Sequence, residues 1–167
     1  MYRFNLGLYI FLSFLIVPAL TLYGPTWLSI YGVYPCWAVI WLLPWALKEG
    51  QLRALIAGIV LGLILDSLGP GMGSQVPILT FLGYWWSRLG SRSSPIRKSF
   101  SLGLLVWIGT FLFGMSIWIQ TIIFEKSAFS FAFWGGSTLL AQSFLTSLIA
   151  PLICSWLLFL WEPRSSI

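Results

Sequence analysis

The sequence of 167 residues has few charged side chains, no histidine and two cysteines. Charged residues make up 8% of the chain, whereas a soluble globular domain has about 25%. Without histidine, and with only Cys36 and Cys154 as thiols, the chain lacks the residues of most zinc sites, His-based triads and paired-cysteine redox motifs. The four carboxylates are scattered along the sequence. We therefore expect no enzymatic activity and no cofactor.

Long stretches of the chain carry no charge at all, namely residues 4–47, 99–124 and 127–161. A helix needs about 20 apolar residues to cross a hydrocarbon core of about 30 Å. These stretches therefore predict an all-α, polytopic membrane protein. The N-terminal segment lacks a convincing cleavage site and is interpreted as a retained first span. We expect one integral membrane domain with six transmembrane helices at about residues 5–23, 33–47, 53–68, 76–86, 100–122 and 136–160.

The nine basic residues separate by predicted membrane face. If the N-terminus is cytoplasmic, eight of them fall on the inner side and only Lys126 falls on the outer side. This asymmetry follows the positive-inside rule, so both termini are expected in the cytoplasm. We interpret the basic charge as a signal of topology at the lipid bilayer and expect no nucleic-acid binding. The main basic cluster lies between the fourth and fifth spans and comprises Arg88, Arg92, Arg97 and Lys98.

Small residues recur at every fourth position of the third predicted span and end at the only aspartate. A helix places Ala54, Gly58, Gly62 and Asp66 on one face. Membrane helices associate by close approach over small residues. This small-residue stripe therefore predicts a packing surface, either for another helix of this chain or for the helix of a partner.

Asp66 lies at the predicted outer end of the stripe, where three roles are open. Its carboxylate could accept hydrogen bonds from backbone N–H groups of the glycine-rich loop at residues 69–74. It could instead contact a partner or ligand, or carry protons. A proton relay normally needs a second buried ionisable group, and the predicted spans contain none. The first role is therefore favoured.

The second predicted span carries an aromatic ridge of Trp37, Trp41 and Trp45. Such a ridge can face lipid, a neighbouring helix or a substrate groove. Pro35 is expected in the first turn of this span. Cys36 and Cys154 are expected in opposite leaflets, as packing residues too far apart for a disulfide.

A pattern of glycines, aromatics and one aspartate extends from residue 35 to residue 84. Its positions are Pro35-x-Trp37, Gly58-x-x-x-Gly62, Asp66, Gly73 and Gly83-Tyr84. The pattern resembles the MreD rod-shape-determining proteins of bacteria. The resemblance implies a non-enzymatic scaffold of the cell-elongation machinery in the inner membrane, with a role in cell shape and peptidoglycan synthesis. Gly58, Gly62, Asp66 and Gly73 carry over as motif positions only.

The same resemblance implies partners and an alternative. MreD proteins are thought to bind MreC, a bitopic membrane protein, and through it to connect with MreB, RodA and a class B penicillin-binding protein. They are also similar in size and span count to the six-helix S subunits of energy-coupling-factor vitamin transporters. Those subunits carry an Ala-x-x-x-Ala surface on the first helix, whereas the first span here has the single alanine Ala19. A scaffold is therefore favoured over a substrate-binding S subunit.

Overall fold

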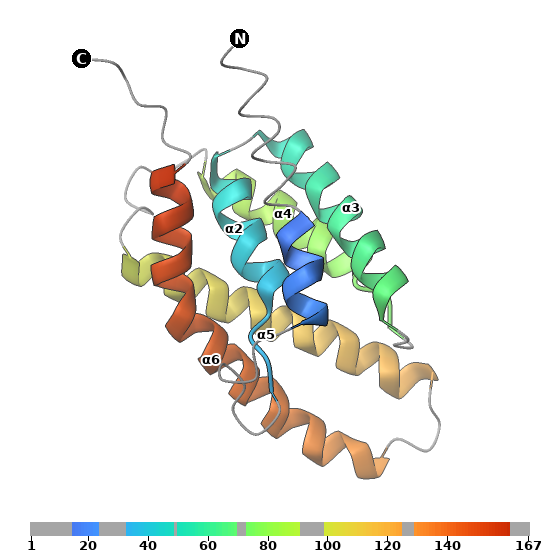
Figure 1. The fold of residues 1–167 in the computed structure, drawn as a ribbon. Helices are drawn as coiled ribbons and strands as arrows, with labels where there is room; N and C mark the ends of the chain where they lie inside the picture. The colour runs from blue at the N-terminus through green and yellow to red at the C-terminus, as the bar shows by residue number, and fades with distance from the viewer. Residues whose placement is uncertain are drawn as a thin grey trace, which may run out of the picture.

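The computed structural model describes residues 15–23, 33–48, 50–69, 73–90, 99–124 and 129–160. Six helical segments and no strand occur in these ranges (Figure 1), so the predicted all-α class is confirmed for them. The first half of the first predicted span, residues 5–14, lies outside the described residues. The helices are residues 15–22, α2 (Trp37–Lys48), α3 (Gln51–Leu68), α4 (Val76–Gly90), α5 (Ser99–Phe124) and α6 (Phe129–Leu160).

Three of the described helices are long and apolar enough to cross a membrane. They are α3, the part of α5 at Ser101–Ile123 and the part of α6 at Gly136–Phe159. Only 33%, 39% and 28% of the most apolar 18 residues in each stretch are buried inside the protein, so most residues there are at least partly exposed. Ile56, Leu148 and Phe159 are among the exposed large hydrophobic residues. Soluble monomers rarely expose contiguous apolar surface on this scale, which indicates a membrane protein.

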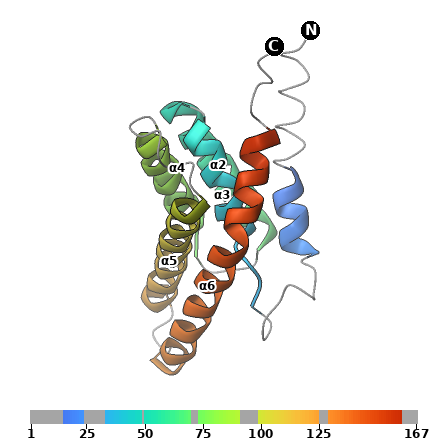
Figure 2. The same ribbon diagram turned by 90° about the vertical axis from the view of Figure 1, so that its left-hand side faces the viewer.

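The central element of the fold is α2, which contacts α3, α4, α5 and α6 (Figures 1 and 2). Eight of its twelve residues are buried, and Val39, Leu42 and Leu43 are fully enclosed. A helix that is apolar all round suits a position inside a bundle. Trp86 of α4 is also fully buried, and its ring lies against Gly109 of α5. The core of the described residues is therefore built around α2.

Helix direction alternates from α2 to α6. Helix α3 is antiparallel to its neighbour α4, and α5 is antiparallel to its neighbour α6. Helix α2 runs parallel to α6. The C-terminal ends of α2 and α4 lie close together. The contacts that set these directions are Ala54 with Gly83, Gly62 with Val76, Gly103 with Pro151, Gly114 with Leu139, Cys36 with Thr146, Ile40 with Cys154, and Leu47 with Gly90.

The start of α2 differs from the prediction. The helix begins at Trp37, and Pro35 lies before it in a non-helical segment, residues 33–36. The proline ring disfavours helical conformation in the residue before it, which here is Tyr34. The N–H of Cys36 also donates to Thr146 Oγ1 on α6, at 3.1 Å. The chain therefore stays non-helical until the proline has been passed.

All four helices after α2 extend beyond the predicted spans, α3 and α5 by a few residues and α4 and α6 by the most. α4 continues past Trp86 to Gly90, where the missing side chain lets the helix lie against the carbonyl of Leu47. Arg88 is therefore helical, although it was predicted in a loop. α6 begins at Phe129, seven residues before the predicted span. Hydropathy predicts the part of a helix that suits hydrocarbon, whereas backbone hydrogen bonding continues beyond it.

The two cysteines lie on neighbouring, parallel segments of the bundle. Both are free and buried, and the thiol of Cys154 donates to the carbonyl of Ile40 at 3.3 Å. Ile40 lies one helical turn after Cys36 on α2. Cys154 therefore lies beside the first half of α2, because α6 runs parallel to α2.

Candidate functional site

The small-residue stripe packs against α4 of the same chain. A Cβ atom added to Gly58 would lie 2.5 Å from the carbonyl oxygen of Leu79, and one added to Gly62 would lie 2.6 Å from the Cα of Val76. From the other side, a Cβ on Gly83 would lie 2.6 Å from the carbonyl oxygen of Ala54. All of these obstacles are backbone atoms, which cannot move aside without separating the helices. The glycines therefore allow the closest approach of α3 to α4.

Asp66 ends the stripe and bonds to the chain just before α4. Its carboxylate accepts one hydrogen bond from the hydroxyl of Ser74 and one from the N–H of Gln75, both at 2.7 Å. Asp66 is half-buried. A carboxylate that accepts hydrogen bonds at the start of a helix also interacts favourably with the helix dipole. Asp66 therefore fixes the point at which α4 begins relative to the end of α3.

Gln120 of α5 joins the same group, although the sequence analysis did not single it out. Its Oε1 accepts from the N–H of Ser74 at 2.7 Å, and its Nε2 donates to the carbonyl of Ser74 at 3.0 Å. Nε2 also lies 3.2 Å from Ser116 Oγ. We call Asp66, Ser74, Gln75 and Gln120 the polar clasp. It ties α3, α4 and α5 together at one end of the bundle.

Gly73 adjoins the clasp, but packing there leaves room for a Cβ atom. A Cβ at this position would lie 3.5 Å from Gln120 Oε1 and 3.6 Å from Ile117 Cγ2, which are ordinary contacts. Residues 70–72 of the predicted glycine-rich loop lie outside the described residues. Of the motif glycines, Gly58 and Gly62 are thus fixed by packing, whereas Gly73 is not.

The aromatic ridge lies inside the bundle. Trp41 is buried, while Trp37 and Trp45 are half-buried. The rings of Trp41 and Trp45 stack with their centroids 5.7 Å apart. The ridge therefore packs mainly against neighbouring helices, and Trp37 alone of the three lines a cavity near the start of α2.

The non-helical segment before α2 has its backbone groups bonded by α6. Gln142 Nε2 donates to the carbonyl of Tyr34 at 3.2 Å, and Thr146 Oγ1 accepts from the N–H of Cys36 at 3.1 Å. Pro35 and Cys36 are buried. Non-helical backbone is tolerated at membrane depth only where protein or a water-filled cavity surrounds it. These two side chains of α6 supply that protection.

Replacing Thr146 with valine is expected to destabilise the protein by about 1–2 kcal/mol, because the buried N–H of Cys36 loses its acceptor. Thermal unfolding in detergent measures the loss. Thr110→Val is the matched control, since Thr110 is equally buried and its hydroxyl donates only to the carbonyl of Val106 in its own helix. Equal stability of the two variants would show that Thr146 does not support the segment.

Comparisons with protein-family models, with curated proteins and with solved structures found no match. Assignment of a function therefore depends on the contacts within this chain.

These contacts are structural. Within the described ranges, no three His, Cys, Asp or Glu side chains come together to hold a metal ion. Both oxygens of Asp66 already accept hydrogen bonds. The polar clasp is therefore arranged to hold chain segments in place.

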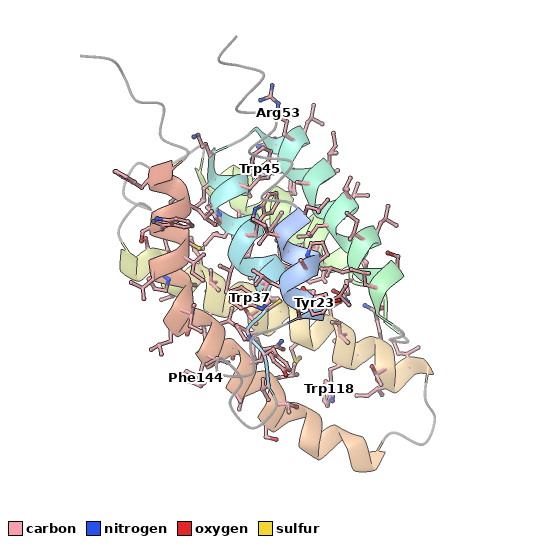
Figure 3. The ribbon with its side chains drawn as sticks, in the orientation of Figure 1. Tyr23, Trp37, Trp45, Arg53, Trp118 and Phe144 are labelled. Atoms are coloured by element: carbon pink, nitrogen blue, oxygen red, sulfur yellow. The ribbon has the colours of Figure 1, made fainter. Side chains whose placement is uncertain are left out.

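The predicted basic cluster is only partly described. Arg88 is exposed near the end of α4, whereas Arg92, Arg97 and Lys98 lie outside the described residues. Arg53 is exposed at the start of α3 and lies at the upper end of the bundle, while Trp118 lies toward the lower end (Figure 3). The described part of the cluster thus lies at the end of the α3 and α4 pair that is opposite the polar clasp.

Proposed function

We propose that this protein is a non-enzymatic scaffold of the bacterial cell-elongation machinery, similar to MreD proteins. In this proposal it binds an MreC-like bitopic partner. Through that partner it connects with MreB, RodA and a class B penicillin-binding protein, and so supports peptidoglycan synthesis and cell shape.

The observation that carries this proposal is that the motif positions at the contact of α3 with α4 form one structural unit. Gly58, Gly62 and Gly83 bring α3 and α4 into contact, and Asp66 fixes the connection between them. Each of these residues is used for packing or for a backbone hydrogen bond. A motif of this kind suits a protein that presents a rigid surface, and it contains no arrangement for catalysis.

We also propose that the chain crosses the inner membrane six times, in an arrangement similar to an S-subunit fold, with both termini in the cytoplasm. The alternating helix directions support this topology, because they place Lys48, Arg53 and Arg88 at one end of the bundle. The 12 residues of α2 reach only about 18 Å. Residues 33–36 can add up to about 13 Å, which together approaches the thickness of the hydrocarbon core.

The partner surface in this proposal is the end of the α3 and α4 pair that carries the polar clasp. The stripe itself is covered by α4, so it is not the site on which a partner helix packs. Ser67, Leu68 and Ser74 are exposed beside Asp66. In the proposed topology they lie at the outer leaflet, within reach of the juxtamembrane segment of a bitopic protein.

Co-purification tests the proposal. The full chain is co-expressed with an MreC-like protein, extracted in mild detergent and captured through a tag on either partner. We expect a stable complex that survives gel filtration. The scaffold function would be contradicted if the chain were monodisperse and folded but did not co-purify with the partner, whichever of the two proteins carried the tag.

A further inference from the structure

A cavity of about 780 Å³ lies at the end of the bundle that carries the described basic residues. Its wall is formed by the end of α2, the start of α3 and the end of α4. Leu47 of α2 and Gly90 of α4 both line it, and their close contact joins two of these three helix ends. The volume falls within the range of small-molecule sites, which is about 300–1,000 Å³.

Two cationic side chains border this basic cavity from different helices. Lys48 ends α2, and Arg53 lies in the first turn of α3 at the upper end of the bundle (Figure 3). Both side chains are exposed, so an ion from outside the protein can approach them. Even with Glu49, which lies outside the described residues, the segment 48–53 is net positive. The basic cavity therefore suits an anion, and a phosphate group in particular, because its several oxygens can accept hydrogen bonds from both cations and from the amide of Gln51.

The basic cavity lies at the depth of lipid headgroups. Helix α3 has 18 residues and is apolar enough to cross a membrane, and its length is about 27 Å. This length is close to the thickness of the hydrocarbon core, about 30 Å. The first turn of α3 therefore lies at the membrane surface, whichever face that is, and basic pockets between membrane helices at this depth suit lipid phosphates.

An exposed apolar track leads from the basic cavity along α3. It begins at Leu52, which lines the cavity and is 77% exposed, and it continues through Ile56, Val60 and Leu63. Spacings of three and four residues place these side chains on one face of the helix. A lipid whose phosphate occupies the cavity would therefore have an acyl chain along this track.

We propose that the basic cavity binds a phosphate group through Lys48 and Arg53, and that this group is the headgroup phosphate of an anionic lipid. A soluble phosphate ester would meet the same two cations, but it would gain nothing from the apolar track. The proposal does not depend on the scaffold function, because it uses only the charge of the cavity and the depth of α3 in the membrane.

Lipid binding to the detergent-purified full chain tests the proposal, measured by native mass spectrometry and by the rise in Tm. Dioleoyl phosphatidylglycerol is the anionic probe. Dioleoyl phosphatidylcholine, which has the same acyl chains and no net charge, is its control, and glycerol 3-phosphate represents the aqueous source. We expect one equivalent of phosphatidylglycerol to bind at least about tenfold more tightly than phosphatidylcholine, and also more tightly than glycerol 3-phosphate.

Single variants locate the binding at the two cations. Lys48→Gln and Arg53→Gln each remove one positive charge and keep a polar side chain, so each should weaken phosphatidylglycerol binding about fivefold. Arg88→Gln is the matched control, because Arg88 is exposed at the same end of the bundle but does not line the cavity. Its loss should leave the affinity nearly unchanged.

The proposal is overturned if phosphatidylcholine binds as tightly as phosphatidylglycerol. It is also overturned if Arg88→Gln weakens binding as much as Arg53→Gln, since the lipid would then be attracted by the whole charged end of the bundle. Equal binding of glycerol 3-phosphate and phosphatidylglycerol would overturn the lipid source. The comparison of the two lipids uses the wild-type chain, so it decides the matter even if a variant folds poorly.

Discussion

Replacing Gly58 with leucine is expected to prevent α3 from packing on α4. The first atom of the new side chain would lie 2.5 Å from the carbonyl oxygen of Leu79 and 2.9 Å from the Cα of Thr80. Because both obstacles are backbone, the helices must separate, and the hydrogen bond from Gln75 to Asp66 would be strained as well. We expect a loss of about 3 kcal/mol or more, which is the upper range for overpacking.

Thermal unfolding and the yield of monodisperse protein after gel filtration measure this effect. Gly58→Ala should give an intermediate loss, because its Cβ meets the same carbonyl but the rest of the leucine side chain is absent. Gly136→Leu is the matched control: Gly136 also lies in a helix, but beyond its own helical neighbours no described atom lies within 4 Å of an added Cβ. If Gly58→Leu were as stable as Gly136→Leu, α3 and α4 would not meet at Gly58.

Replacing Asp66 with alanine should have the second largest effect. The change removes the acceptor for the hydroxyl of Ser74 and for the N–H of Gln75. Hydrogen bonds to a charged group contribute about 1.5–3 kcal/mol each in favourable cases. Since Asp66 is only half-buried and Ser74 is exposed, water can replace part of the loss, and we expect about 2 kcal/mol in total.

Two further variants test whether the loss comes from the acceptor oxygens of Asp66 or from any substitution at this end of α3. Asp66→Asn keeps one acceptor oxygen in nearly the same shape and should lose less stability than Asp66→Ala. Ser67→Ala is the control, because Ser67 is exposed and its hydroxyl donates only to the carbonyl of Ile64. If Asp66→Ala unfolded at the same temperature as Ser67→Ala, the clasp would not hold α4 in place.

Regular patterns in the sequence predicted the helices and the small-residue stripe well, because both depend on neighbours three or four residues apart. The position of Asp66 at the end of its helix was also readable. Its hydrogen-bond donors were expected within residues 69–74, and they are the hydroxyl of Ser74 and the N–H of Gln75, one residue further on. Local spacing thus predicted the neighbourhood of the contact but not its donor atoms.

Contacts between distant segments could not be read in this way. Gln120 bonds to the backbone of Ser74, and Gln142 bonds to the carbonyl of Tyr34, across 46 and 108 residues of sequence. A glutamine inside an apolar helix signals that some polar partner exists. No periodic pattern indicates which backbone group that partner is. For the same reason, the non-helical segment before α2 was predicted as helix.

The central claim is that the end of the α3 and α4 pair, shaped by Asp66, is what a bitopic partner binds. Its most direct test is the amount of MreC-like protein that co-purifies with Asp66→Ala and with Ser155→Ala, measured at equal amounts of folded chain below the unfolding temperature of both. Ser155 is exposed on α6, away from the polar clasp, and its hydroxyl donates to carbonyls of its own helix. We predict that Asp66→Ala retains less than about a tenth of the partner that the wild type retains, a difference of about 1.4 kcal/mol, while Ser155→Ala retains nearly all of it. Equal retention by the two variants would contradict the claim.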